Sequence, residues 1–129
     1  MAAHRVLSVG QCGVDHAAIG GLLRREFDAD VVPADSLEEA LDALRNGRFD
    51  LVLANRVFAY GGSGLDLIAA IKADESLKDV PVVLVSDLPE AQRQAERLGA
   101  LPGFGKSALG RPETARRLAA VLDGHKESL

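Results

Sequence analysis

Short runs of aliphatic residues alternate with helix-like segments along the whole of this chain. The clearest run is Val82–Val85, which is apolar at every position and therefore predicts a strand that is covered on both faces. Further strands are predicted at 6–9, 31–32, 51–54 and, weakly, 103–105. Strands that alternate with helices form a parallel sheet with right-handed crossovers and helices on both faces.

Apolar residues spaced three and four positions apart predict a helix after each of these strands. The predicted helices span 14–27, 37 to Gly47, about 65–74, about 88–98, and 112 to about 122. Ser36 and Glu39 have the spacing of a capping box at the start of the second helix, and Asp87 and Glu90 repeat it before the fourth. Pro33 is expected to stop the second strand.

The length and composition fit one folded domain. A chain of 129 residues, of which 47% are hydrophobic, can bury a substantial core. We expect a single domain over 1–129, with a core at about 4–122 and a loose tail at 123–129. We find no internal repeat, linker or low-complexity segment that would divide it.

The net charge and the cysteine content limit the class of partner and the cellular compartment that this chain fits. A net charge of -4 disfavours nucleic acid as the main partner, because phosphate binding requires a basic face. Cys12 is the only cysteine, so an intrachain disulfide is impossible and a reducing, cytoplasmic setting fits. No apolar run approaches membrane-spanning length, and the N-terminus lacks a signal-peptide core. We therefore expect a cytoplasmic protein without membrane contact.

Polar residues and glycines follow the predicted strands at the places where each strand ends. In parallel α/β sheets the functional crevice lies beyond the carboxyl ends of the strands, at the switch point of the strand order. With a flavodoxin-like order of 2-1-3-4-5, that point joins the ends of the first and third strands. We expect convergence there of Gly10, Gln11, Asn55, Ser86 and Lys106.

The five-unit pattern, together with a few of these positions, resembles the CheY-like receiver domain of bacterial two-component response regulators. Asn55 ends the third strand at the family's phosphoacceptor position, Ser86 matches its hydroxyl after the fourth strand, and Phe104 and Lys106 match its aromatic and lysine. The resemblance covers about 4–122. It implies a three-layer (βα)5 fold with a five-stranded parallel sheet, and it makes Ser86 and Phe104 the switch-like pair.

The same resemblance exposes what this chain lacks. The family has an aspartate at the position of Asn55 and two adjacent acids, which bind magnesium, at those of Gly10 and Gln11. An amide is neutral and a poor nucleophile, and magnesium prefers carboxylate ligands. We therefore expect a degenerate pseudo-receiver that has no catalytic residue, metal or cofactor and is not an enzyme. Asp15 is interpreted as a partner of the first helix dipole rather than as a displaced ligand.

Other departures concern the rim of the predicted crevice. Ser107 replaces the proline that the family has after Lys106, which predicts a trans peptide bond or a rebuilt loop. Asp87 stands where the family prefers a small residue and could approach Lys106. Asn55 either bonds Lys106 or Ser86 as a fixed mimic of one signalling state, or has no role. Lys106 either bonds Asn55 or Asp87, or is solvated.

The leading functional hypothesis is a stand-alone signalling module that binds a protein partner without aspartate phosphorylation. In receivers, the fourth helix, fifth strand and fifth helix form the partner surface, which here predicts contacts through Arg93, Arg97, Phe104, Arg116 and Arg117. The expected partner is a histidine kinase, an output domain or another signalling protein, and homodimerisation is a further option.

Two competing functions remain open from the sequence. One is a working phosphoacceptor that uses another acid, above all Asp87, since Asp50 and Asp66 are poorly placed. The second is a nucleotide-binding enzyme, because 103–107 ends like a phosphate-binding loop. That motif is broken, since Ala100 stands where its first glycine is required. Labelling by a phosphodonor or binding of a nucleotide would separate the three hypotheses.

Overall fold

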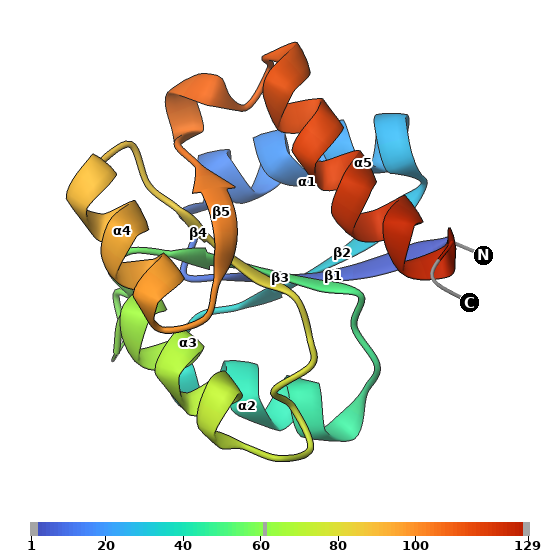
Figure 1. Cartoon of the computed structure of the whole chain (residues 1–129). Helices are drawn as coiled ribbons and strands as arrows, with labels where there is room; N and C mark the ends of the chain where they lie inside the picture. The colour runs from blue at the N-terminus through green and yellow to red at the C-terminus, as the bar shows by residue number, and fades with distance from the viewer. Residues whose placement is uncertain (1–2, 61, 128–129) are drawn as a thin grey trace.

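A computed structural model describes residues 3–60 and 62–127, with side-chain positions up to residue 122. Its sheet has five parallel strands in the order β2-β1-β3-β4-β5, which confirms the predicted flavodoxin-like fold. Helices α1 and α5 cover one face, and α2, α3 and α4 cover the other (Figure 1). The elements are β1 (His4–Val9), α1 (Gly13–Phe27), β2 (Ala29–Ala34), α2 (Leu37–Asn46), β3 (Leu51–Asn55), α3 (Gly64–Ala73), β4 (Val82–Val85), α4 (Pro89–Arg97), β5 (Leu101–Phe104), a 3-10 helix η1 (Lys106–Ala108) and α5 (Pro112–Glu127).

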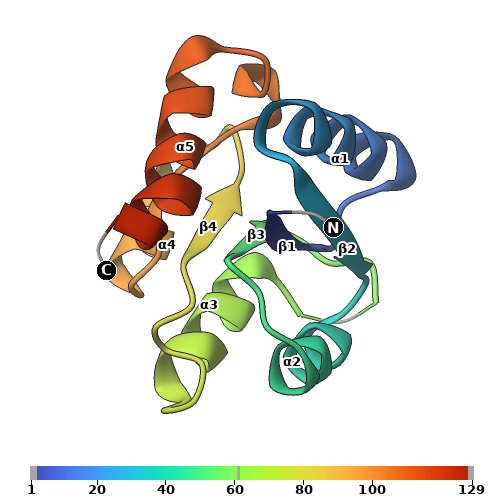
Figure 2. The ribbon, with the colours of Figure 1, turned by 90° about the vertical axis from the view of Figure 1, so that its right-hand side faces the viewer.

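Alternate residues of the central strands point to opposite faces of the sheet. In β3, Val52 and Ala54 pack with α2, α3 and α4, while Leu51 and Leu53 pack with α1 and α5. All of Val82–Val85 is buried in the same alternating way, as the apolar run predicted. Figure 2 shows the two helical layers on either side of the sheet. This doubly covered sheet holds the strand ends in fixed positions.

One predicted helix cap is confirmed and another is wrong. Ser36 Oγ accepts a hydrogen bond from the Glu39 N–H at 3.1 Å, and Gly47 follows the end of α2. The predicted capping of α4 by Asp87 is absent, because Leu88 holds the N-cap position without a side-chain bond. Pro89 occupies the first turn of α4, where its missing N–H is not needed.

Several predicted boundaries differ from the structure. Strand β2 does not stop before Pro33 but runs through it to Ala34. The carbonyl of Ala34 accepts a hydrogen bond from the Gly10 N–H, so the backbone groups of Ala34 face β1. Because the backbone groups of neighbouring strand residues point to opposite sides, those of Pro33 face the open edge of the sheet, where no N–H is required. The opposite edge strand, β5, also contains a proline, Pro102. It spans Leu101–Phe104 and so begins earlier than predicted.

The last helix extends beyond its predicted end. It continues through the segment where a loose tail was expected from Asp123 and reaches Glu127. No proline interrupts this stretch, and a single glycine such as Gly124 costs a helix only about 1 kcal/mol. Residues 128 and 129 lie outside the described part. Within that part, no helix is long and apolar enough to cross a membrane.

Candidate functional site

Two adjoining hollows lie at the carboxyl ends of the strands. The larger, of about 620 Å³, is lined in part by Gly10, Gln11, Asp15, Asp35, Asn55 and Lys106. The smaller, of about 400 Å³, shares Asn55 and Lys106 and adds Ser86, Asp87, Arg56 and Leu88. The structure therefore brings together all of the predicted crevice positions, together with two acids that were not assigned to it. We call the two hollows together the strand-end crevice.

Asn55 is held by backbone carbonyls. Its Nδ2 donates to the carbonyl oxygen of Gly10 at 3.1 Å and to that of Val57 at 3.0 Å. Both oxygens can only accept, so the amide nitrogen must face them. A carboxylate in this orientation would place oxygen against oxygen. The expected bonds to Lys106 or Ser86 are absent, because the side chain instead ties the end of β1 to the loop after β3.

Phe58 is a site residue that the sequence did not reveal. Its side chain is only 5% exposed, and its ring lies against Gly10, whose φ is +75°. A Cβ on Gly10 would overlap the ring and come within 2.8 Å of Phe58 Cε1. The ring therefore occupies the space that a side chain at position 10 would need. A large apolar residue inside a glycine-rich loop was the one available signal for its burial.

Lys106 forms an ion pair with Asp15, and the predicted pairing with Asn55 or Asp87 is wrong. Its Nζ lies 2.6 Å from Asp15 Oδ2 and joins η1 to the first turn of α1. The hydrogen bond from Lys106, aided by one involving Cys12, holds the pKa of Asp15 below its usual range. Asp15 does lie in the first turn of α1, as the dipole interpretation required. It also neutralises the charge of Lys106.

Asp87 faces the loop after β5 rather than the lysine. Its Oδ1 accepts a hydrogen bond from Ser107 Oγ at 2.6 Å. Gly105 allows this approach, because a Cβ there would lie 2.8 Å from Asp87 Cα. Lys106 and Ser107 form part of η1, and none of the peptide bonds in residues 3–60 and 62–127 is cis. The predicted trans bond is therefore present.

Ser86 and Phe104, the predicted switch-like pair, bond to neighbouring backbone groups and to each other. Ser86 Oγ accepts the Leu88 N–H at 3.2 Å, while the Ser86 N–H donates to the Phe104 carbonyl at 2.9 Å. Phe104 is only 6% exposed and packs in the core with α1 and α5. Its predicted place on the partner surface is therefore wrong for this conformation.

Gln92, which the sequence did not single out, donates through Nε2 to the carbonyls of Leu84 at 2.9 Å and Ser86 at 3.0 Å.

The four arginines predicted to face a partner do not form one uniform basic patch. Arg117 donates to the Gly103 carbonyl at 2.8 Å and so stabilises β5. Arg93 lies 3.8 Å from Glu90 on the same helix. The remaining two, Arg97 and Arg116, are exposed.

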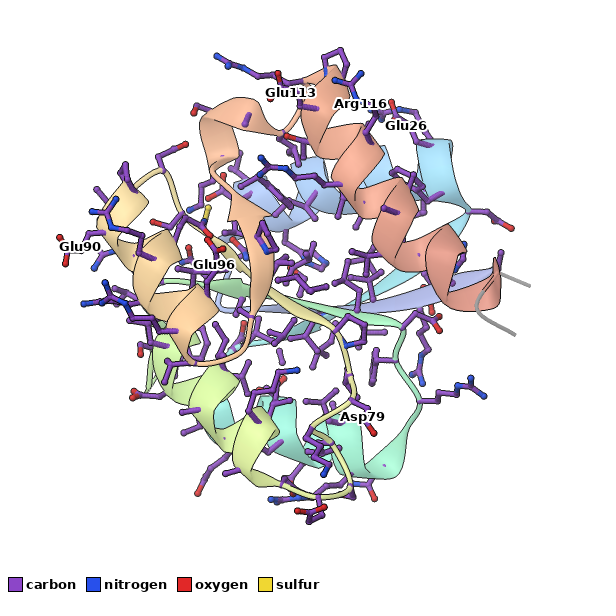
Figure 3. The ribbon with its side chains drawn as sticks, in the orientation of Figure 1. Glu26, Asp79, Glu90, Glu96, Glu113 and Arg116 are labelled. Carbon is purple, nitrogen blue, oxygen red and sulfur yellow. The ribbon has the colours of Figure 1, made fainter. Side chains whose placement is uncertain are left out.

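Acidic residues are interspersed with these arginines. Figure 3 shows Glu90 and Glu96 on α4, and Glu113 beside Arg116 on α5. A surface of alternating charges provides weak electrostatic selection for a strongly acidic partner. The charges of the predicted partner arginines are therefore largely offset by these neighbouring acids.

The strand order, the crevice at the switch point, and the serine and lysine that border it define a receiver-type signalling domain. The chain is 34% identical over 89 residues to the chemotaxis protein CheY of Pseudomonas aeruginosa, covering 69% of each chain. It is 31% identical over 119 residues to CheY-3 of Vibrio cholerae, covering 92% of this chain and 88% of that one. The chain therefore belongs to the CheY-like response regulator receiver family.

Solved structures agree on the fold. The receiver domain of a DNA-binding response regulator from Colwellia psychrerythraea superposes with a TM-score of 0.80 at 17% identity, covering 93% of this chain and 98% of that one. CheY4 of Vibrio cholerae gives a TM-score of 0.68 at 20% identity, with 98% of both chains covered. At these identities the likeness shows the fold alone. No model of a known protein family matches the chain.

Proposed function

We propose that this receiver domain signals by binding a protein partner without aspartate phosphorylation, and that Asn55 accepts no phosphoryl group. The observation that carries the proposal is the orientation of the Asn55 amide. Its nitrogen faces the carbonyl oxygens of Gly10 and Val57, and the lone pair of an amide nitrogen is delocalised. Phosphoryl transfer to this position would need both a different residue and a different local arrangement.

Magnesium does not fit the crevice as it is built. Phe58 fills the space beside Gly10, and Asp15 is already paired with Lys106. No group of three histidine, cysteine, aspartate or glutamate side chains that could hold a metal occurs among the described residues. Magnesium requires hard oxygen ligands in a near-octahedral arrangement, which this crevice does not offer. We therefore derive no step of the function through a metal.

The test is incubation of the whole chain with magnesium and acetyl phosphate, followed by intact mass measurement. The expected result is no added phosphoryl mass. A CheY-like receiver with the full set of acids, treated in parallel, controls for the phosphodonor. A stoichiometric adduct on this chain would overturn the proposal.

Asp87 is the second candidate, as a non-standard phosphoacceptor. It is exposed and lines the smaller hollow with Ser86 and Lys106, which supports testing it. Against it, Oδ1 already accepts from Ser107. If an adduct forms, its loss in Asp87→Asn, with retention in Ser86→Ala, would assign it to the carboxylate.

Phosphorylation of Asp50 or Asp66 has less support, and so does nucleotide binding. Asp50 immediately precedes β3, where its Oδ2 accepts the Arg5 N–H at 2.8 Å, and Asp66 is in the first turn of α3. A phosphate-binding loop needs a helix that begins at its lysine, but Lys106 begins a three-residue 3-10 turn. Absence of nucleotide binding would remove the enzyme hypothesis.

The partner we propose is a histidine kinase, an output domain or another signalling protein, with a second copy of the chain as a further candidate. Receiver domains work through such protein contacts, which supports the general class of partner. The net charge of -4 supports a protein rather than nucleic acid. We place this function in the cytoplasm, which the single unpaired Cys12 supports.

A further inference from the structure

Two exposed apolar side chains line the larger hollow, and a third lies next to a lining residue in the chain. Val14 is 80% exposed, Tyr60 is 78% exposed and Val57 is 54% exposed. Val57 and Tyr60 line the hollow, and Val14 follows Gly13, which also lines it. Exposed apolar side chains gathered around a polar hollow are typical of a surface that another molecule covers.

The charge of the hollow is not balanced. Lys106 is paired with Asp15, so its positive charge is already compensated. Asp35 lines the same hollow, is exposed, and forms no hydrogen bond or ion pair with any residue in the described part of the chain. Among the residues that line the larger hollow, one negative charge therefore remains, which favours a cationic group as the occupant, while the exposed Arg56 lines the adjoining smaller hollow.

The uncharged groups of the hollow add unused hydrogen-bonding capacity. Gln11 has both Oε1 and Nε2 buried without a partner among the described residues. Asn55 uses its amide nitrogen for two carbonyls, and its Oδ1 accepts from no described residue. Buried polar atoms without partners are costly, and those of Gln11 are closed to solvent in this conformation, so a ligand gains affinity from them only when the Gln11 side chain turns toward it. Among the unpaired polar atoms of the hollow, hydrogen-bond acceptors outnumber donors, which favours a ligand with several N–H donors.

A guanidinium group meets these requirements better than an ammonium group. It carries a permanent positive charge and five N–H donors in one plane, so it can bond several separate acceptors at once. Its flat face also stacks on aromatic rings, and Tyr60 offers such a ring at the mouth. Apolar residues next to an arginine in a peptide could pack on Val14 and Val57.

We propose that the larger hollow binds an arginine side chain from a protein partner, with apolar neighbours of that arginine packed on Val14, Val57 and Tyr60. This inference rests on the proposed function, since it names where and how the partner contact is made. It differs from the surface of α4, β5 and α5 in both position and chemistry. The crevice then serves as a docking pocket for a cation rather than as a phosphorylation site.

The test is an NMR titration of the uniformly ¹⁵N-labelled whole chain. The probe is the peptide acetyl-Leu-Arg-Leu-amide, and its control contains citrulline, which has nearly the same shape without the charge. Shifts are expected at the amides of 10–15, 35 and 55–60. The citrulline peptide should bind about tenfold more weakly, because a charge-assisted bond becomes a neutral one. Equal affinity of the two peptides, or shifts centred on α4 and α5, would overturn the proposal.

Two exposed variants make the test specific. Asp35→Asn and Tyr60→Ala should each weaken binding of the arginine peptide by about fivefold or more, through the lost charge and the lost ring. Asp30→Asn is the matched control, because it makes the same charge change at an exposed position near the opposite end of β2 and should leave affinity unchanged. Equal effects of Asp30→Asn and Asp35→Asn would show general charge attraction and reject the pocket.

The two proposals fail in different ways. Phosphoryl labelling by acetyl phosphate would overturn the proposed function whatever the peptide does. No labelling together with no arginine-dependent shifts would leave the proposed function standing and reject the arginine pocket. Thermal midpoints of the variants, expected to match the wild type because both side chains are exposed, control for unfolding.

Discussion

The Phe58 ring lies over Gly10, in the space that any side chain at position 10 would enter. This contact sits where the CheY-like family carries an acidic residue. The glycine and the ring are complementary, because the backbone at φ +75° and the absent Cβ let the aromatic side chain reach 5% exposure. A side chain at position 10 and the buried Phe58 ring therefore exclude one another.

That contact predicts the effect of Gly10→Ala. The variant should lose about 2 kcal/mol or more of unfolding free energy, through overpacking against Phe58 and the strained positive φ. Urea denaturation measures the loss. Gly13→Ala is the control, because a Cβ there meets nothing within 4 Å and the residue lies in the first turn of α1. If both variants lost the same stability, the ring would not be the cause.

A double-mutant cycle isolates the ring. Phe58→Leu should destabilise by itself, but it should reduce the additional cost of Gly10→Ala by about 1 kcal/mol, because residues in contact couple. The part of the cost that arises from positive φ at position 10 should remain. Full additivity of the two substitutions would contradict the contact.

Asn55→Asp should destabilise the fold and should not restore phosphorylation. The new carboxylate would face the carbonyl oxygens of Gly10 and Val57, and we expect a cost of about 1–3 kcal/mol at neutral pH. The cost should shrink in acid as the carboxylate is protonated. Stability by urea denaturation and intact mass after acetyl phosphate treatment measure the two effects. Robust labelling of this single variant would contradict the metal argument, since Gly10 and Gln11 still lack carboxylates.

The ion pair of Asp15 and Lys106 should appear as a pH-dependent contribution to stability. The folded-state pKa of Asp15 is lowered, so the contribution is present above the unfolded-state value of about 3.9 and is lost as pH falls through the folded value. The difference in Tm between wild type and Asp15→Asn should therefore be largest at neutral pH and disappear in strong acid. Asp30→Asn should show no such trend. A difference that grows toward acid would have the wrong sign.

Magnesium should leave the thermal midpoint of the chain unchanged at millimolar concentration. A ligand that binds only the folded state raises the midpoint in proportion to its occupancy, and the crevice offers no suitable set of oxygens. Differential scanning fluorimetry with magnesium, compared with the same concentration of EDTA, measures this. A rise that depends on magnesium concentration would count against the proposed function.

The sequence predicted the architecture well because each element carried its own local signal. The apolar run at Val82–Val85, the Ser36 cap and the glycine at position 47 all act within a few residues, and each is present as predicted. The prediction that β2 stops at Pro33 was wrong, because the rule that proline ends a strand does not hold at the open edge of a sheet.

The interior of the crevice could not be predicted in the same way. The partner of Lys106 is Asp15, from an element far away in the chain, and no local pattern pairs them. The Asn55 bonds depend on the direction of two loop carbonyls, which has no periodic signature in the sequence. Phe58 lies in the loop after β3 and packs against Gly10 at the end of β1, so its burial emerges only once the strands are assembled.

The prolines at the two sheet edges also limit how this protein can associate. Pro33 faces the open side of β2, and Pro102 lies in β5, where the Gly103 carbonyl is already bonded to Arg117. The missing N–H of Pro33 and the occupied carbonyl of Gly103 each remove one bonding group that an incoming strand would use. The domain is thereby protected against edge-to-edge aggregation, and neither a second copy nor a partner can readily extend its sheet. These edge features favour recognition through helices and loops over extension of the sheet.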